Sequence, residues 1–322
     1  MTNSKQKKMP NNIDFNGKPI VIVIVGPTAS GKTALSIELA KKINGQVVSC
    51  DSMQIYKDMT IGSAKPTKEE MQGIKHYMID AVNPNERFSV AEYKIQAEKA
   101  IEEIIRNNKI PIVVGGTGLY ADSLIYNIEY PNIEFDKEYR ENLESQAKTE
   151  EGLKKLYEQA QKIDKEACKK ISKSDKKRII RILEIFNKTG KTKTQLDEES
   201  RLKEPKYNYK VFAIDIKREI LYERINKRVD QMIELGLIDE VKNIMNKYNE
   251  FPTAMQAIGY KEVVEYLENK ISYEEMIEKI KQETRRYAKR QLTWFRKNKD
   301  KIWLDGLEDR QNNINIILGE IT

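Results

Sequence analysis

Residues 26–33 read GPTASGKT, and this stretch predicts a phosphate-binding loop. The apolar run Val21–Val25 precedes it, and a helical pattern of apolar residues begins at Ala34. Two glycines let successive backbone N–H groups close around a polyphosphate at the positive end of a helix. The lysine then reaches the terminal phosphoryl oxygens, the last hydroxyl can ligate Mg²⁺, and the loop fits a diphosphate as well as a triphosphate. The expected loop consists of Gly26, Pro27, Thr28, Ala29, Ser30, Gly31, Lys32 and Thr33, with Thr33 as the Mg²⁺ ligand.

The composition is that of a globular protein that does not cross a membrane. The chain has 322 residues, of which 39% are hydrophobic, and this suffices for one large domain or two ordinary ones. No apolar stretch approaches the roughly 20 residues that a membrane helix needs, and the N-terminus lacks the apolar segment of a signal peptide. We expect a cytoplasmic protein whose residues 1–17 form a disordered tail.

Cysteine and histidine are too scarce for a disulfide framework or a zinc site. Cys50 and Cys168 lie far apart and form no C-x-x-C pair, and His76 is the single histidine. We expect His76 to have a structural role.

The net charge of +7 is concentrated in two stretches, residues 173–193 and 285–301, which are rich in Lys and Arg and poor in acids. One such run is typical of a solvated helix face. Two runs in a chain with a phosphate loop favour a polyanionic partner such as RNA.

The segments around the loop predict a parallel sheet. Val21–Val25 and Gln46–Cys50 have strand character, and Thr33–Ile43 between them has helical character. A strand, a helix and a strand in this order form a parallel pair with a right-handed crossover. Asp51 and Ser52 therefore emerge at the carboxyl edge of the sheet, where ligands bind.

A helical segment interrupts the sheet farther along the chain. Ser89 and Glu92 form a capping box, a buried strand follows at Ile110–Val114, and Tyr209–Ile216 returns to strand character. The expected fold is α/β, a P-loop NTPase-like parallel sheet flanked by helices, built from residues 18–126 and 206–322 with a mostly helical insertion at 127–205. Further helices are expected at Lys217–Leu235, Ile238–Tyr248 and Tyr273–Arg296.

Two further features bear on the chemistry. The strand at Ile110–Val114 continues into Gly-Gly-Thr-Gly at 115–118, where a kinase usually has an aspartate that holds Mg²⁺. Asp51 is the best candidate for a general base, because it follows a buried strand at the edge where the phosphates must lie. Helix capping and Mg²⁺ binding remain alternative roles for Asp51.

Taken in order, the motifs resemble those of the bacterial-type tRNA dimethylallyltransferases over nearly the whole chain, from Val21 to Trp303. Beyond the loop, they are DSMQIYKDMTIGSAKP at 51–66, HYMID at 76–80, RFSVAEY at 87–93, VGGTGLY at 114–120, KRIIRILEIF at 177–186, KRVDQMIELGLIDEV at 227–241, QAIGYKE at 256–262 and RYAKRQLTWFRK at 286–297. Two departures are mild, Ser63 in place of the usual threonine and Tyr77 where a second histidine is common. The zinc finger of some eukaryotic relatives is absent.

The resemblance implies a prenyl transferase that moves a dimethylallyl group from dimethylallyl diphosphate to N6 of the adenosine 3′ of the anticodon, position 37, in tRNAs that read codons beginning with U. It implies that Asp51 accepts the proton of the exocyclic amine. Lys32, the loop amides, Mg²⁺ on Thr33 and Arg228 would stabilise the leaving diphosphate. Thr117 would form a hydrogen bond near the scissile oxygen.

The resemblance also implies how tRNA binds, with the protein as a monomer and no membrane partner. The residues implied in contact with the anticodon stem-loop are Asp51, Ser52, Met53, Gln54, Thr117, Arg140, Lys177, Arg178, Ile179, Ile180 and Arg181. Three alternatives remain: a small-molecule kinase with ATP in the loop, an isopentenyltransferase that acts on free AMP, and a non-catalytic RNA-binding module. The first is disfavoured by the Gly-Gly-Thr turn, the second by the insertion, and the third by the full set of site residues.

Overall fold

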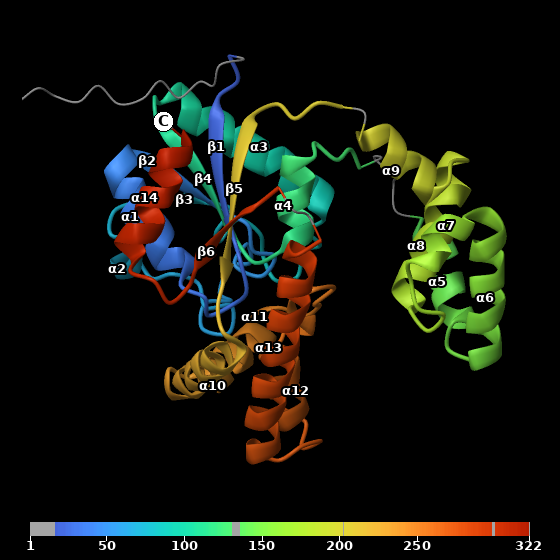
Figure 1. Cartoon of the computed structure of the whole chain (residues 1–322). Coiled ribbons are helices and arrows are strands. Elements are labelled where there is room, and N and C mark those ends of the chain that lie inside the picture. Colours follow the sequence, from blue (N-terminus) through green and yellow to red (C-terminus); the bar gives the residue numbers. More distant parts are fainter. Residues whose placement is uncertain (1–16, 131–135, 202, 298–299, 322) are drawn as a thin grey trace, which may run out of the picture. The chain divides into compact units, whose positions relative to one another are not determined.

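A parallel sheet forms the centre of the larger part of the chain (Figure 1). The computed structural model describes residues 17–130, 136–201, 203–297 and 300–321. Within these residues six strands form one sheet in the order β3-β2-β4-β1-β5-β6, and every neighbouring pair is parallel. The strands are β1 (Ile20–Val25), β2 (Gly45–Ser49), β3 (His76–Tyr77), β4 (Ile110–Gly115), β5 (Asn208–Asp215) and β6 (Ile302–Asp305).

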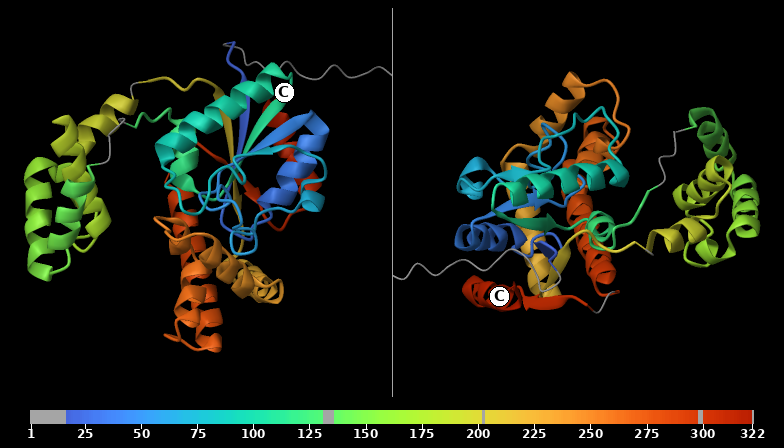
Figure 2. Two further views of the ribbon diagram at one scale, coloured as in Figure 1. Left: turned by 180° about the vertical axis from the view of Figure 1, so that it is seen from behind. Right: turned by 90° about the horizontal axis from the view of Figure 1, so that it is seen from above.

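Both faces of the sheet are buried, which explains the uninterrupted apolar sequence of β1. Ile20, Ile22 and Ile24 face one apolar cluster, which includes residues of α1 (Lys32–Ile43) and α14 (Arg310–Ile321). The alternate residues Val21, Val23 and Val25 face a second cluster with α3 (Val90–Arg106) and α4 (Gly118–Ile125). Figure 2 shows these helices on opposite sides of the sheet. The predicted three-layer α/β core is confirmed.

Three features expected from the sequence agree with the structure: the cap of α3, the pairing of β5 and the position of His76. Ser89 caps α3 with the predicted capping box, since its hydroxyl accepts from the Glu92 N–H and the Glu92 carboxylate accepts from the Ser89 N–H. The strand after the helical segment, β5, pairs with β1 and so joins the sheet as expected. His76 lies in β3, and its Nδ1 is 2.8 Å from the Ile74 carbonyl oxygen, which fits a structural role.

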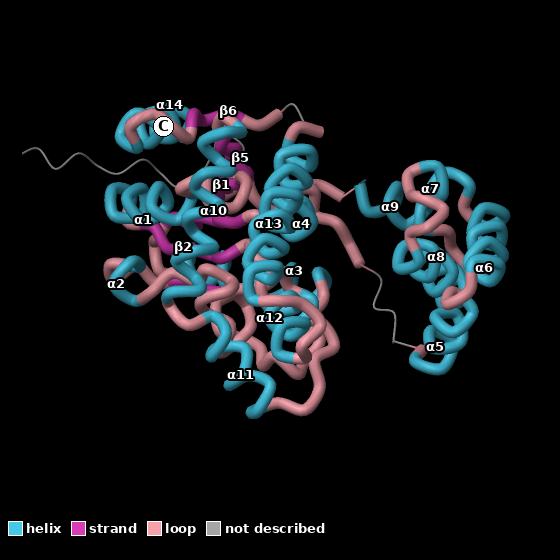
Figure 3. The backbone as a smooth tube through the Cα atoms, turned by 90° about the horizontal axis from the view of Figure 1, so that it is seen from below, coloured by secondary structure: helices cyan, strands magenta, loops and turns pink. Residues whose placement is uncertain are grey.

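A second group of helices lies below the carboxyl ends of the strands in Figure 1, and Figure 3 shows these helices from below. It comprises α10 (Arg218–Glu234), α11 (Leu237–Lys247), the 3₁₀ turn η1 (Ala254–Gln256), α12 (Tyr260–Leu267) and α13 (Tyr273–Phe295). Helix α13 packs against both α10 and α12. The short helix α2 (Lys68–Met71) completes this part of the chain. Because this group of helices lies at the carboxyl ends of the strands, the long helix α13 contributes side chains to the edge of the sheet where the phosphate loop lies.

The chain divides into two compact units. Unit 1 contains residues 1–125 and 205–322, and unit 2 contains residues 126–204. Unit 2 has its own apolar core, with Leu143, Leu156 and Ile179 among its buried side chains. Its helices are α5 (Lys137–Gln146), α6 (Glu150–Ile163), α7 (Lys165–Lys169), α8 (Lys176–Thr189) and α9 (Lys193–Arg201). The expected disordered tail, residues 1–17, lies outside the described residues except for Gly17.

None of the helices in the described ranges is long and apolar enough to cross a bilayer.

The close approach of β2 and β4 at the edge of the site gives a first prediction. A Cβ on Gly115 would lie 2.0 Å from the Cys50 carbonyl oxygen, a backbone atom that cannot rotate away. Gly115→Ala should therefore lower the free energy of unfolding by about 3 kcal/mol or more, measured by urea denaturation.

Gly319→Ala is the matched control, because a Cβ at that helical position meets nothing within 4 Å. This variant should be neutral or about 0.5–1 kcal/mol more stable. Equal stability of the Gly115 and Gly319 variants would contradict the packing described for this edge.

Candidate active site

A cavity of about 840 Å³ opens at the carboxyl edge of the sheet. Its wall includes the phosphate loop from Thr28 to Thr33, the segment from Asp51 to Gln54 that follows β2, and Gly115 and Gly116 at the end of β4. Helices α10 and α13 provide the remaining wall, with Arg224, Arg228, Tyr287, Arg290 and Gln291 among the residues that line it. The structure thus brings the predicted loop and the predicted general base to one cavity.

The loop has the backbone geometry that its glycines permit. Gly31 is the N-cap of α1 with φ 89°, a left-handed conformation that favours glycine. No side chain caps the first turn of α1, so its N–H groups and the positive end of the helix dipole remain available to an anion. This geometry supports the prediction of a phosphate-binding loop.

Two cations meet at the loop. Lys32 Nζ donates to the Pro27 carbonyl oxygen at 2.5 Å, and Arg228 Nη1 donates to Thr28 Oγ1 at 3.4 Å. Removal from bulk water lowers the pKa of Lys32 to about 7, with repulsion from Arg228 as the second cause, while Asp51 opposes the shift. Burial also lowers the pKa of Arg228. Both shifts reflect the cost of holding positive charge here, and a bound diphosphate would reduce that cost.

Asp51 combines a structural contact with a free carboxylate oxygen. Its Oδ1 accepts from the N–H groups of Met53 at 2.9 Å and Gln54 at 3.4 Å, so it caps the turn after β2. Within the described part of the chain Oδ2 has no hydrogen-bond partner. One oxygen therefore orients the carboxylate, and the other is available to accept a proton. The predicted alternatives of capping and base are compatible.

Thr117 lies behind the cavity wall. Its Oγ1 accepts from the Ser52 N–H at 3.0 Å and lies 3.3 Å from Ser52 Oγ, while its own N–H donates to the Cys50 carbonyl oxygen at 3.1 Å. The Tyr287 hydroxyl interacts with Thr117, and burial raises the pKa of Tyr287 above its usual value. Thr117 thus connects the turn after β4 to the segment that carries Asp51. Its role at the scissile oxygen remains a prediction.

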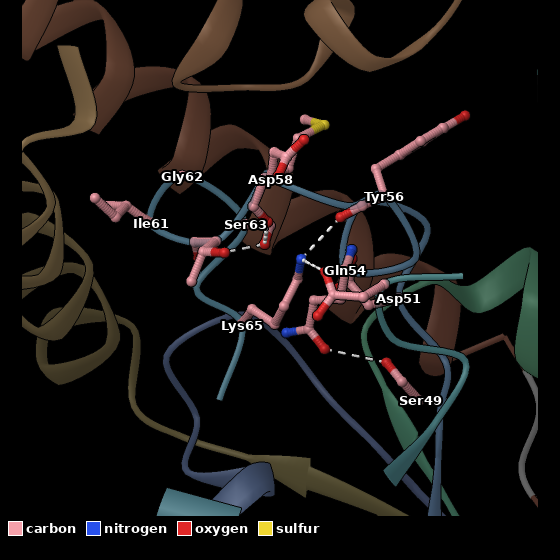
Figure 4. A network of polar contacts seen from close by, with 12 residues as sticks. Ser49, Asp51, Gln54, Tyr56, Asp58, Ile61, Gly62, Ser63 and Lys65 are labelled. Atoms are coloured by element: carbon pink, nitrogen blue, oxygen red, sulfur yellow. Dashed lines mark hydrogen bonds and ion pairs between the residues drawn. The ribbon is translucent and has the colours of Figure 1, made fainter. Parts of the chain in front are cut away.

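The segment from Asp51 to Lys65 is held by a polar network (Figure 4). Gln54 accepts from Ser49 Oγ at 3.1 Å and donates to the Ala64 carbonyl oxygen at 3.2 Å. Lys65 Nζ donates to the Tyr56 carbonyl oxygen at 2.8 Å and forms an ion pair with Asp80.

From α11, the Glu240 carboxylate accepts three backbone N–H groups of the same segment, at residues 60–62, over 2.7–3.1 Å. These contacts come from β2, α11, the residues that follow β3 and the segment itself. They fix the segment whose first residues line the cavity.

The RNA-contact residues predicted on α5 and α8 fall into two groups in unit 2. Lys177, Arg178 and Arg181 are exposed on α8, whereas Ile179 and Ile180 are 0% and 3% exposed in the core of the unit. Helix α8 turns both side chains inward, so the contact of Ile179 and Ile180 with RNA stays a prediction that only their backbone could fulfil. On α5, Arg140 pairs with Glu144 at 3.0 Å and with Glu184 at 3.5 Å.

Sequence reasoning missed the α13 side chains that reach the cavity. The run at 285–301 was interpreted as a basic face for RNA, yet Tyr287 and Gln291 point to the site. Their spacing of four residues within a helix was the available signal, since residues four apart share a face.

In the part of the chain that the structure describes, no three His, Cys, Asp or Glu side chains converge to hold a metal ion by themselves. A metal cation at this site would therefore need oxygen atoms of a bound molecule, together with a protein hydroxyl, to complete its coordination. The Thr33 hydroxyl lines the cavity and has no hydrogen-bond partner among the described residues.

The fold and the cavity define a protein with a P-loop-like fold and a carboxylate beside the loop. A model of the family described as IPP transferase matches residues 54–298. The chain belongs to this IPP transferase family.

Curated relatives carry one name. The chain is 52% identical over 279 residues to a tRNA dimethylallyltransferase of Caldanaerobacter subterraneus, covering 86% of this chain and 88% of the relative. It is 50% identical over 286 residues to that of Acetivibrio thermocellus, covering 88% and 91%.

Two solved structures are similar to this chain in fold and in sequence. The tRNA isopentenylpyrophosphate transferase of Bacillus halodurans matches with a TM-score of 0.69 and 41% identity over 94% of this chain and 96% of its own. A eukaryotic dimethylallyltransferase acting on tRNA matches with a TM-score of 0.79 and 34% identity, over 94% of this chain and 80% of that one.

The lowered pKa of Lys32 gives a prediction for ligand binding. Below pH 7 Lys32 is charged, and above pH 7 it loses its proton in the free protein. Inorganic diphosphate favours the charged form, so its affinity should fall by up to about tenfold per pH unit above 7, with proton uptake on binding. Isothermal titration calorimetry at pH 6–8.5 measures both.

Lys32→Met is the control, because protonation of diphosphate itself affects both proteins equally. The ratio of the two affinities should shrink as the pH rises. A ratio independent of pH would show that Lys32 is charged throughout.

Proposed function

We propose that this protein transfers the dimethylallyl group of dimethylallyl diphosphate to N6 of the adenosine at position 37, 3′ of the anticodon, in tRNAs that read codons beginning with U, and releases diphosphate. The observation that carries the proposal is the pairing, in one cavity, of two cations at a phosphate loop with the turn-oriented carboxylate of Asp51. The names of the relatives support it.

The diphosphate provides most of the donor's affinity. Five carbons at roughly 0.8 kcal/mol per buried methylene contribute about 4 kcal/mol at most. Lys32, Arg228 and the N–H groups of the loop supply charge-assisted contacts to the phosphates. These contacts strengthen as negative charge develops on the leaving group, which makes them catalytic as well as binding contacts.

Mg²⁺ fits the site as a partner of the diphosphate. Thr33 would hold it through its hydroxyl, while the remaining ligands would be phosphate oxygens and water. Bound there, Mg²⁺ would supply further neutralisation of the leaving group's charge.

Asp51 is the proposed proton acceptor. The lone pair of an exocyclic amine is delocalised into the purine, so attack on carbon requires that the amine lose a proton as the new bond forms. The turn after β2 fixes Asp51 Oδ1 and leaves Oδ2 to accept that proton. In this proposal the base acts on the amine that attacks the reacting carbon, and the cations act on the diphosphate that leaves it.

The adenosine must leave the stacked anticodon loop to reach this cavity. Extrusion of a base costs a few kcal/mol, less in a loop than in a duplex. The cavity of about 840 Å³ is large enough for a base beside the donor, and Ser52, Met53 and Gln54 would read it together with its neighbours. In unit 2, Lys177, Arg178 and Arg181 are the exposed cations proposed to bind the stem-loop phosphates, with Arg140 held between Glu144 and Glu184.

Replacement of Asp51 by asparagine separates its two roles, because the amide oxygen can still cap the turn. Asp51→Asn should lower the rate of dimethylallyl transfer to an anticodon stem-loop about 10²- to 10⁴-fold in single-turnover assays. Its melting temperature should change little, because the amide oxygen keeps the contacts of Oδ1 with the turn. A normal transfer rate would reassign the base.

A phosphate contact in unit 2 is tested by salt dependence. Lys177→Ala should weaken all stem-loops similarly and reduce the slope of log K against log salt by about one unit. Lys155→Ala is the control, since Lys155 pairs with Glu151 at 2.7 Å on α6. A loss confined to particular stem-loop sequences would contradict the role of Lys177.

A further inference from the structure

One face of α13 contacts two parts of the cavity wall, the phosphate loop and the turn that follows β4. Tyr287, Gln291 and Trp294 follow each other by four and three residues, so they share a face of the helix. All three approach the turn at 116–118 that follows β4. The helix comes from a distant part of the sequence, so these contacts are tertiary and not local.

Gln291 joins the two turns that flank the phosphate site. Its Oε1 accepts from the N–H of Thr28 in the phosphate loop at 2.9 Å. Its Nε2 donates to the carbonyl oxygen of Gly116 at 2.9 Å. The side chain is 5% exposed, so both backbone groups depend on it in place of water.

Gly116 and Gly118 leave room for the side chains of Gln291 and Trp294. A Cβ on Gly116 would lie 2.2 Å from Gln291 Nε2, and a Cβ on Gly118 would lie 2.3 Å from Trp294 Cδ1. Trp294 Nε1 in turn donates to Asp122 Oδ2 at 2.9 Å, which anchors α4 to α13. The glycines let the helix approach the turn closely.

The same turn leads to the general base. Thr117 follows Gly116 directly and binds the N–H of Ser52, the residue after Asp51. Gln291 therefore connects the donor side of the cavity, at Thr28, to the acceptor side, at Thr117 and Asp51. Gln291 binds backbone atoms of both turns, and the Thr117 hydroxyl completes the connection to the segment of Asp51.

We infer that Gln291 is a positioning residue for transfer: it fixes the separation between the phosphate loop and the turn after β4, so that the leaving diphosphate and Asp51 lie on opposite sides of the reacting carbon. The inference rests on the proposed function. A misplacement of about 1 Å can slow a reaction about 100-fold without weakening substrate binding, because binding contacts within each half are kept.

Gln291→Met keeps the length of the side chain and removes both hydrogen bonds. We expect kcat for dimethylallyl transfer to fall about 10- to 100-fold, while KM for the donor and for the stem-loop change less than about threefold. Gln282→Met, on the exposed side of the same helix, is the matched control and should behave as the unchanged protein. Rates are expressed per folded protein, from circular dichroism at the assay temperature.

Gln291→Glu distinguishes a role of Gln291 in hydrogen bonding from a role in packing alone. A protonated carboxyl group has one acceptor and one donor, like the amide, whereas the ionised form cannot donate to Gly116 and is repelled by its carbonyl oxygen. The ratio of the variant's kcat to that of the unchanged protein should therefore rise as the pH falls from about 7.5 to about 5, toward the ordinary pKa of a glutamate.

Two results would overturn the inference: a kcat of Gln291→Met within about twofold of the unchanged protein, or a Gln291→Glu ratio that does not vary with pH. Either would leave the proposed function intact, provided that the unchanged protein transfers dimethylallyl. Absence of transfer by the unchanged protein would instead refute the proposed function.

Discussion

The burial of two cations, Lys32 and Arg228, beside the phosphate loop is the constraint on which the site depends. Two cations share one enclosed cavity, and the pKa of each is lowered by that enclosure. Their arrangement costs free energy until a polyanion lies between them. A diphosphate satisfies both cations and the free amides of the loop, and its negative charge increases when the carbon–oxygen bond breaks. The same contacts therefore favour the products of carbon transfer.

The scaffold must hold these charges in place with interactions that do not involve the ligand. Alternate residues of β1 fill two apolar clusters, so the strand that leads to the loop is fixed from both faces. Glu240 and Lys65 fix the segment that carries Asp51, and Gln291 joins the loop to the turn after β4. The contacts of Glu240 and Gln291 link segments distant in sequence, whereas the contact of Lys65 with Tyr56 is local. The active site is thus a product of tertiary structure around a local motif.

Local patterns were sufficient for the phosphate loop, for the strands with continuous apolar runs and for the capping box at Ser89. They were insufficient for β3, which has two residues, and for β6, which has four residues, follows a run of basic residues and exposes Trp303 and Asp305. The family resemblance implies contact of Ile179 and Ile180 with RNA, whereas the helical periodicity of the segment turns their side chains inward, as the structure shows. Gln291 was missed because its partners, Thr28 and Gly116, are more than 170 residues away in sequence.

The central claim is that the cavity binds the diphosphate as the leaving group, so that the carbon group and not a phosphoryl group is transferred. Mass spectrometry of an anticodon stem-loop, incubated with the protein, Mg²⁺, ATP and dimethylallyl diphosphate together, tests it most directly. The account predicts that the stem-loop gains one five-carbon group at a single adenosine while an equal amount of diphosphate appears and ATP is unchanged. A stem-loop that gains phosphate at the expense of ATP, with the prenyl donor intact, would contradict it.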